Sequence, residues 1–318
     1  MKKRMSKPRI LLFSYSDLGY RAIEFLHSRG HNVVGLFTHE NNPAEFPWYR
    51  TPDTFAREHG IPVYTPGKLN TEEWIEKVRA IKPDLIFSIY YRNMIPTKIL
   101  DIPSLGSYNM HGSYLPQIRG CAPTNWALAI GATETGATLH HMTAGADAGD
   151  IVDQEKVLID PEENGKELFF KVSDAAMKVL DRQIDKLCAG TAPRTKQDES
   201  QATYYGRRKP EDGQINWSKT AVEAFNLVRA VAYPYPGAFT DIEGKRLMIW
   251  WGKPKEGGSS NSLIPGQIAS LSPLTIATSE GVLEINSSSW VDPTDTSHYV
   301  DPPVLKIGQI IEQIGHAA

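Results

Sequence analysis

The first half of the chain alternates between short apolar runs and longer segments with helical spacing. Residues 9–15 contain a continuous apolar stretch, and residues 17–30 place apolar side chains three and four positions apart before a glycine. The same alternation of strand and helix continues over residues 32–91. Strands that are apolar on both faces, with helices between them, are typical of a parallel sheet covered by helices on both sides.

The second half of the chain changes character at two points. Further strands and helices are predicted first, over residues 106–111, 122–131, 136–143, 150–159 and 167–190. Residues 191–213 are polar and rich in turn formers, which predicts a linker that wraps the first domain. After a helix at residues 220–232, short strands separated by Gly, Pro and Ser indicate a small antiparallel β-domain, with a barrel as one possible form. We therefore predict an α/β domain at residues 1–190, a linker at 191–213, and a small β-domain with a short tail at 214–318.

Composition narrows the class of protein without identifying it. Hydrophobic residues make up 41% of the 318 residues and charged residues 22%, as in ordinary globular proteins. The formal net charge of −3 gives no basic field that would recruit nucleic acid. Cys121 and Cys188 form neither a disulfide framework nor a zinc spacing, which favours a reducing, cytoplasmic compartment. The apolar run at residues 10–13 is too short for a signal peptide, and no run is long enough to suggest a membrane span.

Two polar side chains stand where a predicted strand ends. Asn109 and His111 are two positions apart, so they project from the same face of the strand, at the carboxyl end where open α/β sheets place their sites. An amide stabilises developing negative charge, an imidazole also carries a proton, and a carboxylate such as Asp147 fixes the imidazole tautomer. These groups suit acyl transfer to a nucleophile that arrives with the substrate. Equally, the three residues could satisfy a turn and cap a helix, and their pattern leaves both interpretations open.

Other catalytic motifs are missing or incomplete. The first strand–helix turn, residues 14–22, lacks the G-x-G-x-x-G of dinucleotide-binding folds, and the chain contains no G-x-S-x-G elbow of the α/β-hydrolases. His140 and His141 are adjacent, so on a strand they point to opposite faces and cannot chelate one metal ion. We predict a structural role for both histidines and no metal site.

The residues around Asn109 and His111 carry a more specific signal. The segment "YNMHGSYLPQIRGCAPTNWALAIGATETGATLHHMTAGADAGDIVDQ", residues 108–154, resembles the signature region of the 10-formyltetrahydrofolate-dependent formyltransferases. The shared features are Asn-x-His at a strand end, a Ser-x-Leu-Pro-x-x-Arg-Gly loop, and an Asp ahead of Gly-Asp-Ile. The resemblance extends from near Pro8 through "YYGRRKPEDGQINW" and into the β-domain.

This resemblance implies a fold and an activity. The implied fold is a Rossmann-like, doubly wound, mostly parallel sheet followed by a smaller C-terminal antiparallel β-domain of the OB-like barrel type. The implied activity is transfer of a formyl group from 10-formyltetrahydrofolate, without a metal. The segments "HGIPVYTP" and "YGRRKPED" are most similar to the branch that formylates UDP-4-amino-4-deoxy-L-arabinose for lipid A. The decarboxylase half of that bifunctional enzyme is not expected in this chain.

The family's residue roles carry over to matching positions. The resemblance implies that Asn109 stabilises the oxyanion, that His111 is the general acid or base, and that Asp147 supports the charged imidazole. Two segments are implied to hold the folate, and their residues are Asn93, Met94, Ile95, Thr143, Ala144, Gly145, Ala146 and Asp147. The substrate amine would attack the formyl carbon, and its proton would leave through His111 or Asp147. The sequence leaves that choice open.

The predicted acceptor is an amino sugar linked to UDP or dTDP. Its predicted contacts are Arg119, Arg207, Arg208, Trp48 and Tyr49. The two aromatic rings could stack on a pyrimidine base or anchor their loop on the core, and the paired arginines could meet a diphosphate or stay solvated. Tyr114 and Cys121 depart from the family pattern, Tyr114 from its Leu-Leu-Pro turn.

Two alternatives accompany this prediction. Methionyl-tRNA formyltransferase has the same two-domain plan, but it resembles an RNA binder with a basic loop and a basic C-terminal domain. Here residues 38–60 carry four acidic residues against two Arg, and residues 206–318 carry ten Lys and Arg against twelve Asp and Glu, a formal charge of −2. The other alternative is a catalytically silent sugar-nucleotide sensor. The predicted partners are folate and a nucleotide sugar, rather than nucleic acid or a membrane, and the family suggests a homodimer.

Overall fold

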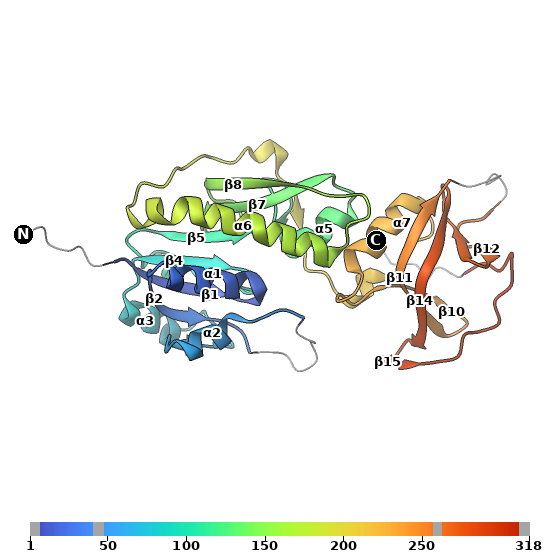
Figure 1. The fold of residues 1–318 in the computed structure, drawn as a ribbon, viewed down its shortest axis with the longest axis horizontal. Coiled ribbons are helices and arrows are strands. Elements are labelled where there is room, and N and C mark those ends of the chain that lie inside the picture. The colour runs from blue at the N-terminus through green and yellow to red at the C-terminus, as the bar shows by residue number, and fades with distance from the viewer. Residues whose placement is uncertain (1–6, 41–47, 257–262, 312–318) are drawn as a thin grey trace, which may run out of the picture. The chain divides into compact units, whose positions relative to one another are not determined.

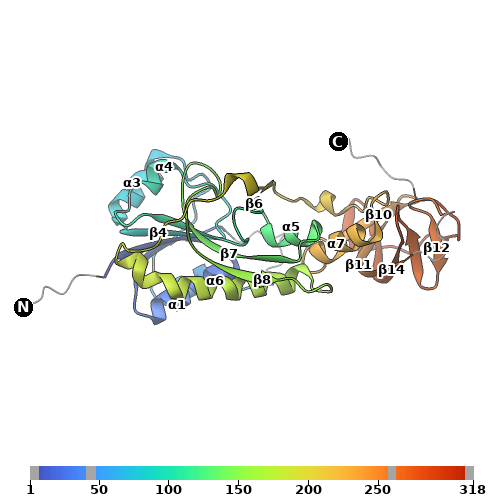
Figure 2. The same ribbon diagram turned by 90° about the horizontal axis from the view of Figure 1, so that it is seen from above.

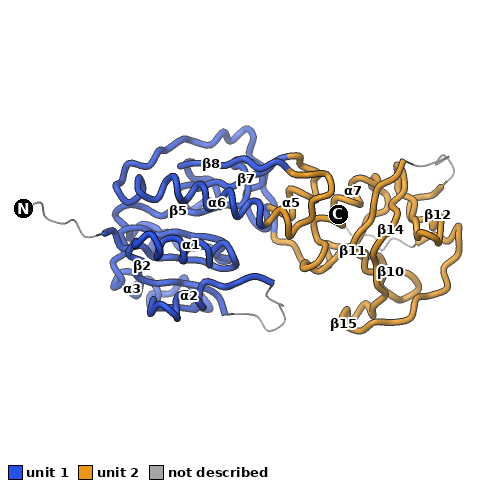
Figure 3. Tube along the Cα trace, in the orientation of Figure 1, with its two compact units in different colours: residues 1–123, 134–158, 170–206 blue, residues 124–133, 159–169, 207–318 orange. Residues whose placement is uncertain are grey.

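The computed structural model describes residues 7–40, 48–256 and 263–311. They belong to two compact units, which Figure 3 shows in different colours. The first unit comprises residues 1–123, 134–158 and 170–206. The second comprises residues 124–133, 159–169 and 207–318.

The predicted linker is divided between these units. In the part that belongs to the first unit, Thr195 exchanges two backbone hydrogen bonds with Ile151, at 2.7 and 2.9 Å. The short strand β9 (Tyr204–Tyr205) pairs with β6 (Arg119–Gly120). A polar composition identifies an extended segment, but it carries no information on which unit the backbone of that segment pairs with.

A seven-stranded sheet forms the centre of the first unit, in the order β3-β2-β1-β4-β5-β7-β8. Its strands are β1 (Arg9–Ser14), β2 (Asn32–Phe37), β3 (Val63–Tyr64), β4 (Leu85–Ile89), β5 (Ser107–His111), β7 (Glu134–His141) and β8 (Ile151–Leu158). Its helices are α1 (Ser16–Ser28), α2 (Pro52–Glu58), α3 (Glu72–Ile81), α4 (Thr97–Leu100) and α6 (Gly165–Cys188), of which residues 165–169 belong to the second unit, and the 3₁₀ helix η1 (Glu199–Gln201).

The strand directions confirm the predicted doubly wound sheet. All pairs from β3 to β5 are parallel, whereas β7 is antiparallel to β5 and β8 is antiparallel to β7. The chain order reverses between β1 and β4, which lie side by side. The carboxyl ends of strands at such a switch point are where open α/β sheets bind ligands.

Helices cover both faces of this sheet. Figure 2 shows α3 and α4 on one face and α1 and α6 on the other. The α3–α4 side is an apolar cluster in which Leu11 and Phe13 of β1 pack with side chains of β2, β4, α3 and α4. On the other side Arg21 of α1 forms an ion pair with Asp174 of α6 at 2.7 Å. Strands covered on both faces must be apolar throughout, which explains the uninterrupted burial of Ile10–Ser14 in β1.

The second unit is built on an antiparallel sheet, labelled on the right of Figure 1. Its strands are β10 (Ala238–Ile242), β11 (Lys245–Lys255), β12 (Ile268–Leu271), β13 (Leu274–Ala277), β14 (Val282–Asp292) and β15 (Asp295–Tyr299). The order is β10-β11-β14-β13-β12, and β15 also pairs with β14. The strand pairs of the described residues do not close this order into a ring. The antiparallel domain is therefore confirmed, whereas the OB-like barrel is not.

Short helices complete the second unit, namely α5 (Pro123–Ala129), whose first residue belongs to the first unit, the 3₁₀ helix η2 (Pro210–Gly213) and α7 (Ala221–Val231). The α7 helix begins with a capping box, in which Thr220 and Glu223 each accept a hydrogen bond from the other's backbone N–H. Trp217 is fully buried, and its ring N–H donates to Thr240 Oγ1 at 3.2 Å. Much of the predicted tail, residues 312–318, lies outside the described residues. In the described part of the chain, no helix combines the length and apolar character of a membrane span.

Candidate active site

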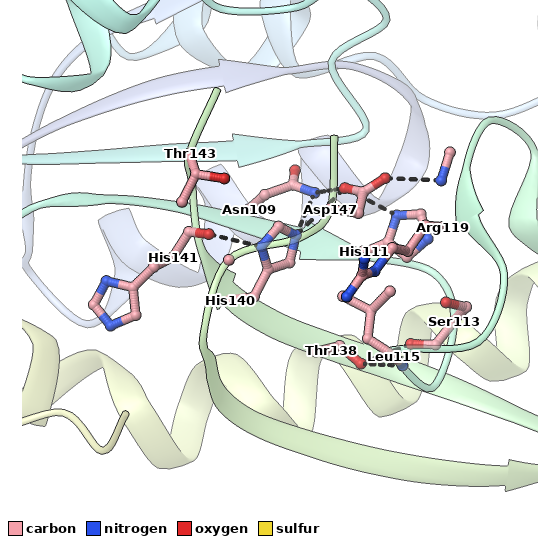
Figure 4. A network of polar contacts seen from close by, with 12 residues as sticks. Asn109, His111, Ser113, Leu115, Arg119, Thr138, His140, His141, Thr143 and Asp147 are labelled. Carbon is pink, nitrogen blue, oxygen red and sulfur yellow. Dashed lines mark hydrogen bonds and ion pairs between the residues drawn. The ribbon is translucent and has the colours of Figure 1, made fainter. Parts of the chain in front are cut away.

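β5 ends with the two polar side chains that the sequence singled out. Asn109 and His111 point to the same side, toward the loop that follows β7 (Figure 4). Tyr108 and Met110, which alternate with them along the strand, are buried. The period of two along a strand therefore delivers both polar groups to one place.

Asp147 approaches these residues from the loop between β7 and β8. Its Oδ1 lies 3.1 Å from Asn109 Nδ2 and 3.6 Å from His111 Nδ1, and its Oδ2 accepts from the N–H of Gly120 at 2.9 Å. Asp147 has φ of 51°, in the left-handed region, which costs about 1–2 kcal/mol for a residue with a Cβ. The three residues predicted to be catalytic are thus brought together around one carboxylate.

The surroundings of Asp147 keep its carboxyl ionised. Burial alone would raise the pKa of Asp147, because its side chain is only 14% exposed. Positive charge on His111 and the hydrogen bond from the N–H of Gly120 outweigh burial, so the pKa of Asp147 lies well below its ordinary value of 3.8. The site therefore contains a fixed negative charge between two imidazoles at neutral pH.

This lowered pKa predicts how the stability of the protein depends on pH. As the pH falls, the unfolded chain takes up the Asp147 proton before the folded chain does, so the stabilisation is complete above about pH 4 and is lost below it. We expect the difference in free energy of unfolding between wild type and Asp147→Asn to shrink as the pH falls below about 4. Urea unfolding at each pH measures it, and a difference that grows toward acid would contradict the assignment.

The contacts of His111 define its tautomer. Nε2 lies 2.8 Å from the carbonyl oxygen of Ile118, which can only accept, so Nε2 carries a proton. In the neutral ring the lone pair is then on Nδ1, which faces Asp147 Oδ1. The proton that this ring gains or loses is therefore the one at Nδ1, beside a carboxylate. That arrangement is suited to general acid–base chemistry.

His140, for which a structural role is predicted, also contacts this site. Its Nδ1 is 2.9 Å from the carbonyl oxygen of His141, so Nδ1 is the protonated nitrogen. Its Nε2 is 3.1 Å from Asn109 Nδ2 and 3.4 Å from Asp147 Oδ1. The amide of Asn109 thus donates one N–H to His140 and the other to Asp147. Figure 4 shows His141 pointing away, as expected for neighbouring strand residues.

The sequence predicts that one of the two adjacent histidines faces Asn109, but it does not predict that this is His140. Adjacent histidines on a strand point to opposite faces, but the chain alone does not say which of them faces Asn109. The antiparallel register of β5 and β7, which sets Asn109 opposite His140, decides it.

The loop after His111 is held rigidly against the sheet. Thr138 Oγ1 donates to the carbonyl oxygen of Ser113 at 2.7 Å and accepts from the N–H of Leu115 at 3.1 Å. Tyr114, one of the departures from the family pattern, lies beside Gly136, where a Cβ would come within 3.0 Å of its ring. The glycine on β7 therefore leaves room for the larger side chain.

The two segments predicted to hold the folate both border one apolar cluster. Ile95 belongs to this cluster, and Met142, which precedes the 143–146 loop, packs against it. Met94 is 63% exposed, and within the described residues no backbone hydrogen bond involves Asn93 or Met94. The loop residues Thr143, Ala144, Gly145 and Ala146 are exposed as well. Open peptide groups above an apolar base fit a flat heteroaromatic ring with donors and acceptors on its edge.

The predicted substrate arginines have different environments. Arg119 is fully buried and binds Glu199 at 2.7 Å, so its guanidinium offers no surface to a substrate in this arrangement. Arg208 lies over the ring of Trp126 at 4.6 Å, and burial lowers its pKa. Arg207 is exposed. No local pattern signals the burial of Arg119, because a buried arginine depends on partners from elsewhere in the chain.

The two aromatic residues predicted to contact the substrate, and Cys121, have side chains or backbone groups that contact other parts of the protein. The ring of Trp48 meets that of Phe170 on α6, edge to face, at 5.8 Å, which anchors it to the first unit. The hydroxyl of Tyr49 lies 3.4 Å from a guanidinium nitrogen of Arg92. Residues 41–47 of the same loop lie outside the described residues. The thiol-bearing Cys121 is exposed, and its N–H donates to Tyr205 O at 3.0 Å.

No three His, Cys, Asp or Glu side chains gather to hold a metal ion in the described ranges. What the site offers instead is an amide donor, an imidazole with an exchangeable proton at Nδ1, and an ionised carboxylate. Within the described residues, no protein hydroxyl or thiol forms a hydrogen bond with these three side chains. Such a set is suited to stabilising negative charge on a carbonyl oxygen while a substrate nucleophile attacks.

Comparison with known families gives two matches along the chain. Residues 10–184 match the model of the formyl transferase family, and residues 207–291 match the model of the formyl transferase C-terminal domain. The first match includes Asn109, His111, His140 and Asp147.

Solved structures with the same fold include an N-formyltransferase from Helicobacter canadensis in complex with folinic acid and dTDP-3-aminofucose. It is 18% identical, with a TM-score of 0.69, and the alignment covers 89% of this chain and 100% of that one. A 4-N formyltransferase from Francisella tularensis is 20% identical, with a TM-score of 0.61 and coverage of 74% and 93%. HypX from Aquifex aeolicus, in complex with tetrahydrofolic acid, is 19% identical, with a TM-score of 0.61 and coverage of 89% and 44%. Identities this low establish the fold alone.

Proposed function

We propose that this chain, an enzyme that belongs to the formyl transferase family, transfers the formyl group of 10-formyltetrahydrofolate to the amine of a nucleotide-linked amino sugar. The observation that carries the proposal is the convergence of Asn109, His111 and Asp147, with contacts of 3.1 and 3.6 Å to one carboxylate oxygen. The proposed acceptor is a 4-amino sugar on UDP or dTDP, such as UDP-4-amino-4-deoxy-L-arabinose. Similar folds that bind folates and a dTDP-3-amino sugar support a nucleotide-linked amino sugar, and the 4-N formyltransferase of the same fold supports position 4.

In this proposal, Asn109 and His111 stabilise the charge that develops during transfer. Bound 10-formyltetrahydrofolate supplies an electrophilic formyl carbon and its carbonyl oxygen. The Asn109 amide donates both of its N–H groups to His140 and Asp147, so holding an oxyanion requires exchanging one of these acceptors for the substrate oxygen. Such preorganised donors act most strongly where water is excluded.

Proton transfer is assigned to the His111–Asp147 pair. The new carbon–nitrogen bond forms at the sugar amine while the bond from the formyl carbon to the folate nitrogen breaks, so one proton must pass from the first nitrogen to the second. His111 Nδ1 is the atom that can take and return it, because Nε2 is committed to Ile118 O. Asp147 stays ionised and stabilises the imidazolium.

The nucleotide side is assigned to groups at the switch point between β1 and β4. The Arg92 guanidinium lies 4.5 Å from the centre of the Tyr15 ring and 3.4 Å from Tyr49 Oη. Its backbone N–H donates to His39 Nε2 at 3.0 Å. A cation held among aromatic rings suits a diphosphate joined to a planar base.

An acceptor assay tests this function. The protein is incubated with 10-formyltetrahydrofolate and, separately, with UDP- or dTDP-linked 4-amino sugars or with charged initiator tRNA, and release of tetrahydrofolate is followed. We expect turnover with a nucleotide sugar only. An Asn109→Ala variant should turn over on the order of 10²–10³ more slowly, because one oxyanion donor is lost.

The other outcomes identify the alternatives. Turnover with tRNA alone would assign methionyl-tRNA formyltransferase, and no turnover with any acceptor would favour a silent sugar-nucleotide sensor. Cytoplasmic location, a homodimer and a place in lipid A modification belong to the same proposal. Fractionation of cells and sedimentation of the purified protein test the first two.

A further inference from the structure

Gln197 connects the catalytic loop to the segment that follows α6. It stands two residues after Thr195, whose backbone is paired with Ile151. Its Nε2 donates to the main-chain oxygens of Asp147, at 2.8 Å, and of Gly149, at 2.6 Å. Gln197 therefore contacts the main chain of the loop whose carboxylate enters the site.

The other end of this amide is held by a buried guanidinium. Gln197 Oε1 accepts from Arg119 Nε at 3.1 Å and from Nη2 at 2.7 Å. Both N–H groups and both lone pairs of the amide are then used, which sets its orientation, because a flipped amide would turn its own donors toward the guanidinium. Arg119 is 0% exposed and also donates to both carboxylate oxygens of Glu199 and to the Tyr204 hydroxyl.

Arg119 stands between two residues that contact the catalytic groups. Ile118 O accepts from His111 Nε2 at 2.8 Å, and the N–H of Gly120 donates to Asp147 Oδ2 at 2.9 Å. The side chain between them leads through Gln197 back to the main chain of Asp147. Residues 118–120 therefore hold Asp147 in two ways. The N–H of Gly120 binds its carboxylate, and Arg119 binds its main-chain oxygen through Gln197.

The Asp147 loop adopts a conformation that needs such support. Asp147 has φ of 51°, and a Cβ on Gly149 would lie 1.8 Å from the carbonyl oxygen of His141, so the loop packs too tightly there for any other residue. Strained backbone persists only where the surrounding structure holds it. We infer that Gln197 is a positioning residue that acts through Asp147. It keeps the Asp147 loop in the conformation that aims the carboxylate at His111 Nδ1. This inference rests on the proposed function.

Two substitutions separate this role from stability and from substrate binding. Gln197→Glu keeps an acceptor for Arg119 but loses both donors to the loop, and Gln197→Met keeps the length but loses every polar contact. We expect kcat to fall on the order of 10- to 100-fold in both, with KM for folate and acceptor within about threefold of wild type. The control is Gln201→Glu, an exposed glutamine on η1 whose side chain bonds Gln117 and Asp198, and it should retain wild-type kcat.

A double-mutant cycle tests whether Gln197 acts through Asp147. On an Asp147→Asn background, measured in single turnovers, Gln197→Glu should slow transfer by less than about twofold, since the carboxylate it positions is gone. Additive losses, a kcat within twofold of wild type in both Gln197 variants, or a rise in KM with unchanged kcat would each overturn the inference.

A measurement without substrate keeps this inference distinct from the proposed function. In Gln197→Glu and Gln197→Met, we expect amide hydrogen exchange in a peptide covering residues 143–151 to be faster than in wild type, and to be unchanged in Gln201→Glu. Unaltered exchange in both Gln197 variants would overturn positioning, whatever the enzyme's acceptor. Faster exchange, combined with a wild-type protein that formylates nothing, would overturn only the proposed function.

Discussion

Replacing His111 with asparagine is expected to lower kcat for formyl transfer on the order of 10²–10⁴, with the fold retained. The imidazole is the group whose Nδ1 can exchange a proton beside Asp147, and an amide can neither accept nor return that proton. The asparagine amide overlays Nδ1 of the ring and is too short to replace Nε2, so the variant also loses the N–H that Nε2 donates to Ile118 O. Steady-state release of tetrahydrofolate measures kcat, and folate binding by fluorescence should change little.

His141→Asn is the matched control for this substitution. His141 comes from the adjacent strand β7 and points away from the site (Figure 4). Its Nε2 is buried and has no hydrogen-bond partner in the described structure, so the variant breaks no contact at that atom. If His141→Asn loses as much turnover as His111→Asn, the proton-transfer role assigned to His111 is wrong.

Replacing Asp147 with asparagine is expected to lower kcat on the order of 10²–10³. Within the described residues, Asp147 is the only carboxylate that contacts Asn109 or His111, and it carries the negative charge that stabilises the imidazolium. An asparagine of the same shape keeps an oxygen for the N–H of Gly120 but lacks that charge. The loss should therefore appear in kcat rather than in KM.

Asp150→Asn provides the comparison on the same loop. Asp150 lies three residues further along and forms an ion pair with Arg194 at 2.6 Å, and the two side chains are 24% and 61% exposed. An ion pair this exposed contributes little to stability, so the variant should retain wild-type turnover. Equal losses in Asp147→Asn and Asp150→Asn would mean that the loop, and not the Asp147 charge, limits the reaction.

Local patterns predicted the elements from which the site is built. The apolar strand at residues 9–15 and the glycine-terminated helix after it correspond to β1 and α1, and the strand at 106–111 corresponds to β5. These features depend on side chains close in sequence, so periodicity records them. The projection of the Asn109 and His111 side chains from one face of the strand was predictable in the same way, because it follows from the geometry of any strand.

Contacts between distant segments could not be predicted in this way. Only the β5–β7 register turns His140, rather than His141, toward Asn109. Only the pairing of the segment after α6 with the first unit brings Gln197 to the Asp147 loop and buries Arg119. Their sequence neighbours give no sign of either contact.

The alternation of strands and helices and the same-side placement of Asn109 and His111 follow from local sequence patterns, and the family follows from the resemblance. The tertiary structure alone decided which histidine joins them, what holds the Asp147 carboxylate, and that Arg119 serves the interior of the protein and not its surface. The physical reason is that strand and helix periods are properties of a few neighbouring residues. Register, loop conformation and burial are set by segments that meet only when the whole chain has folded.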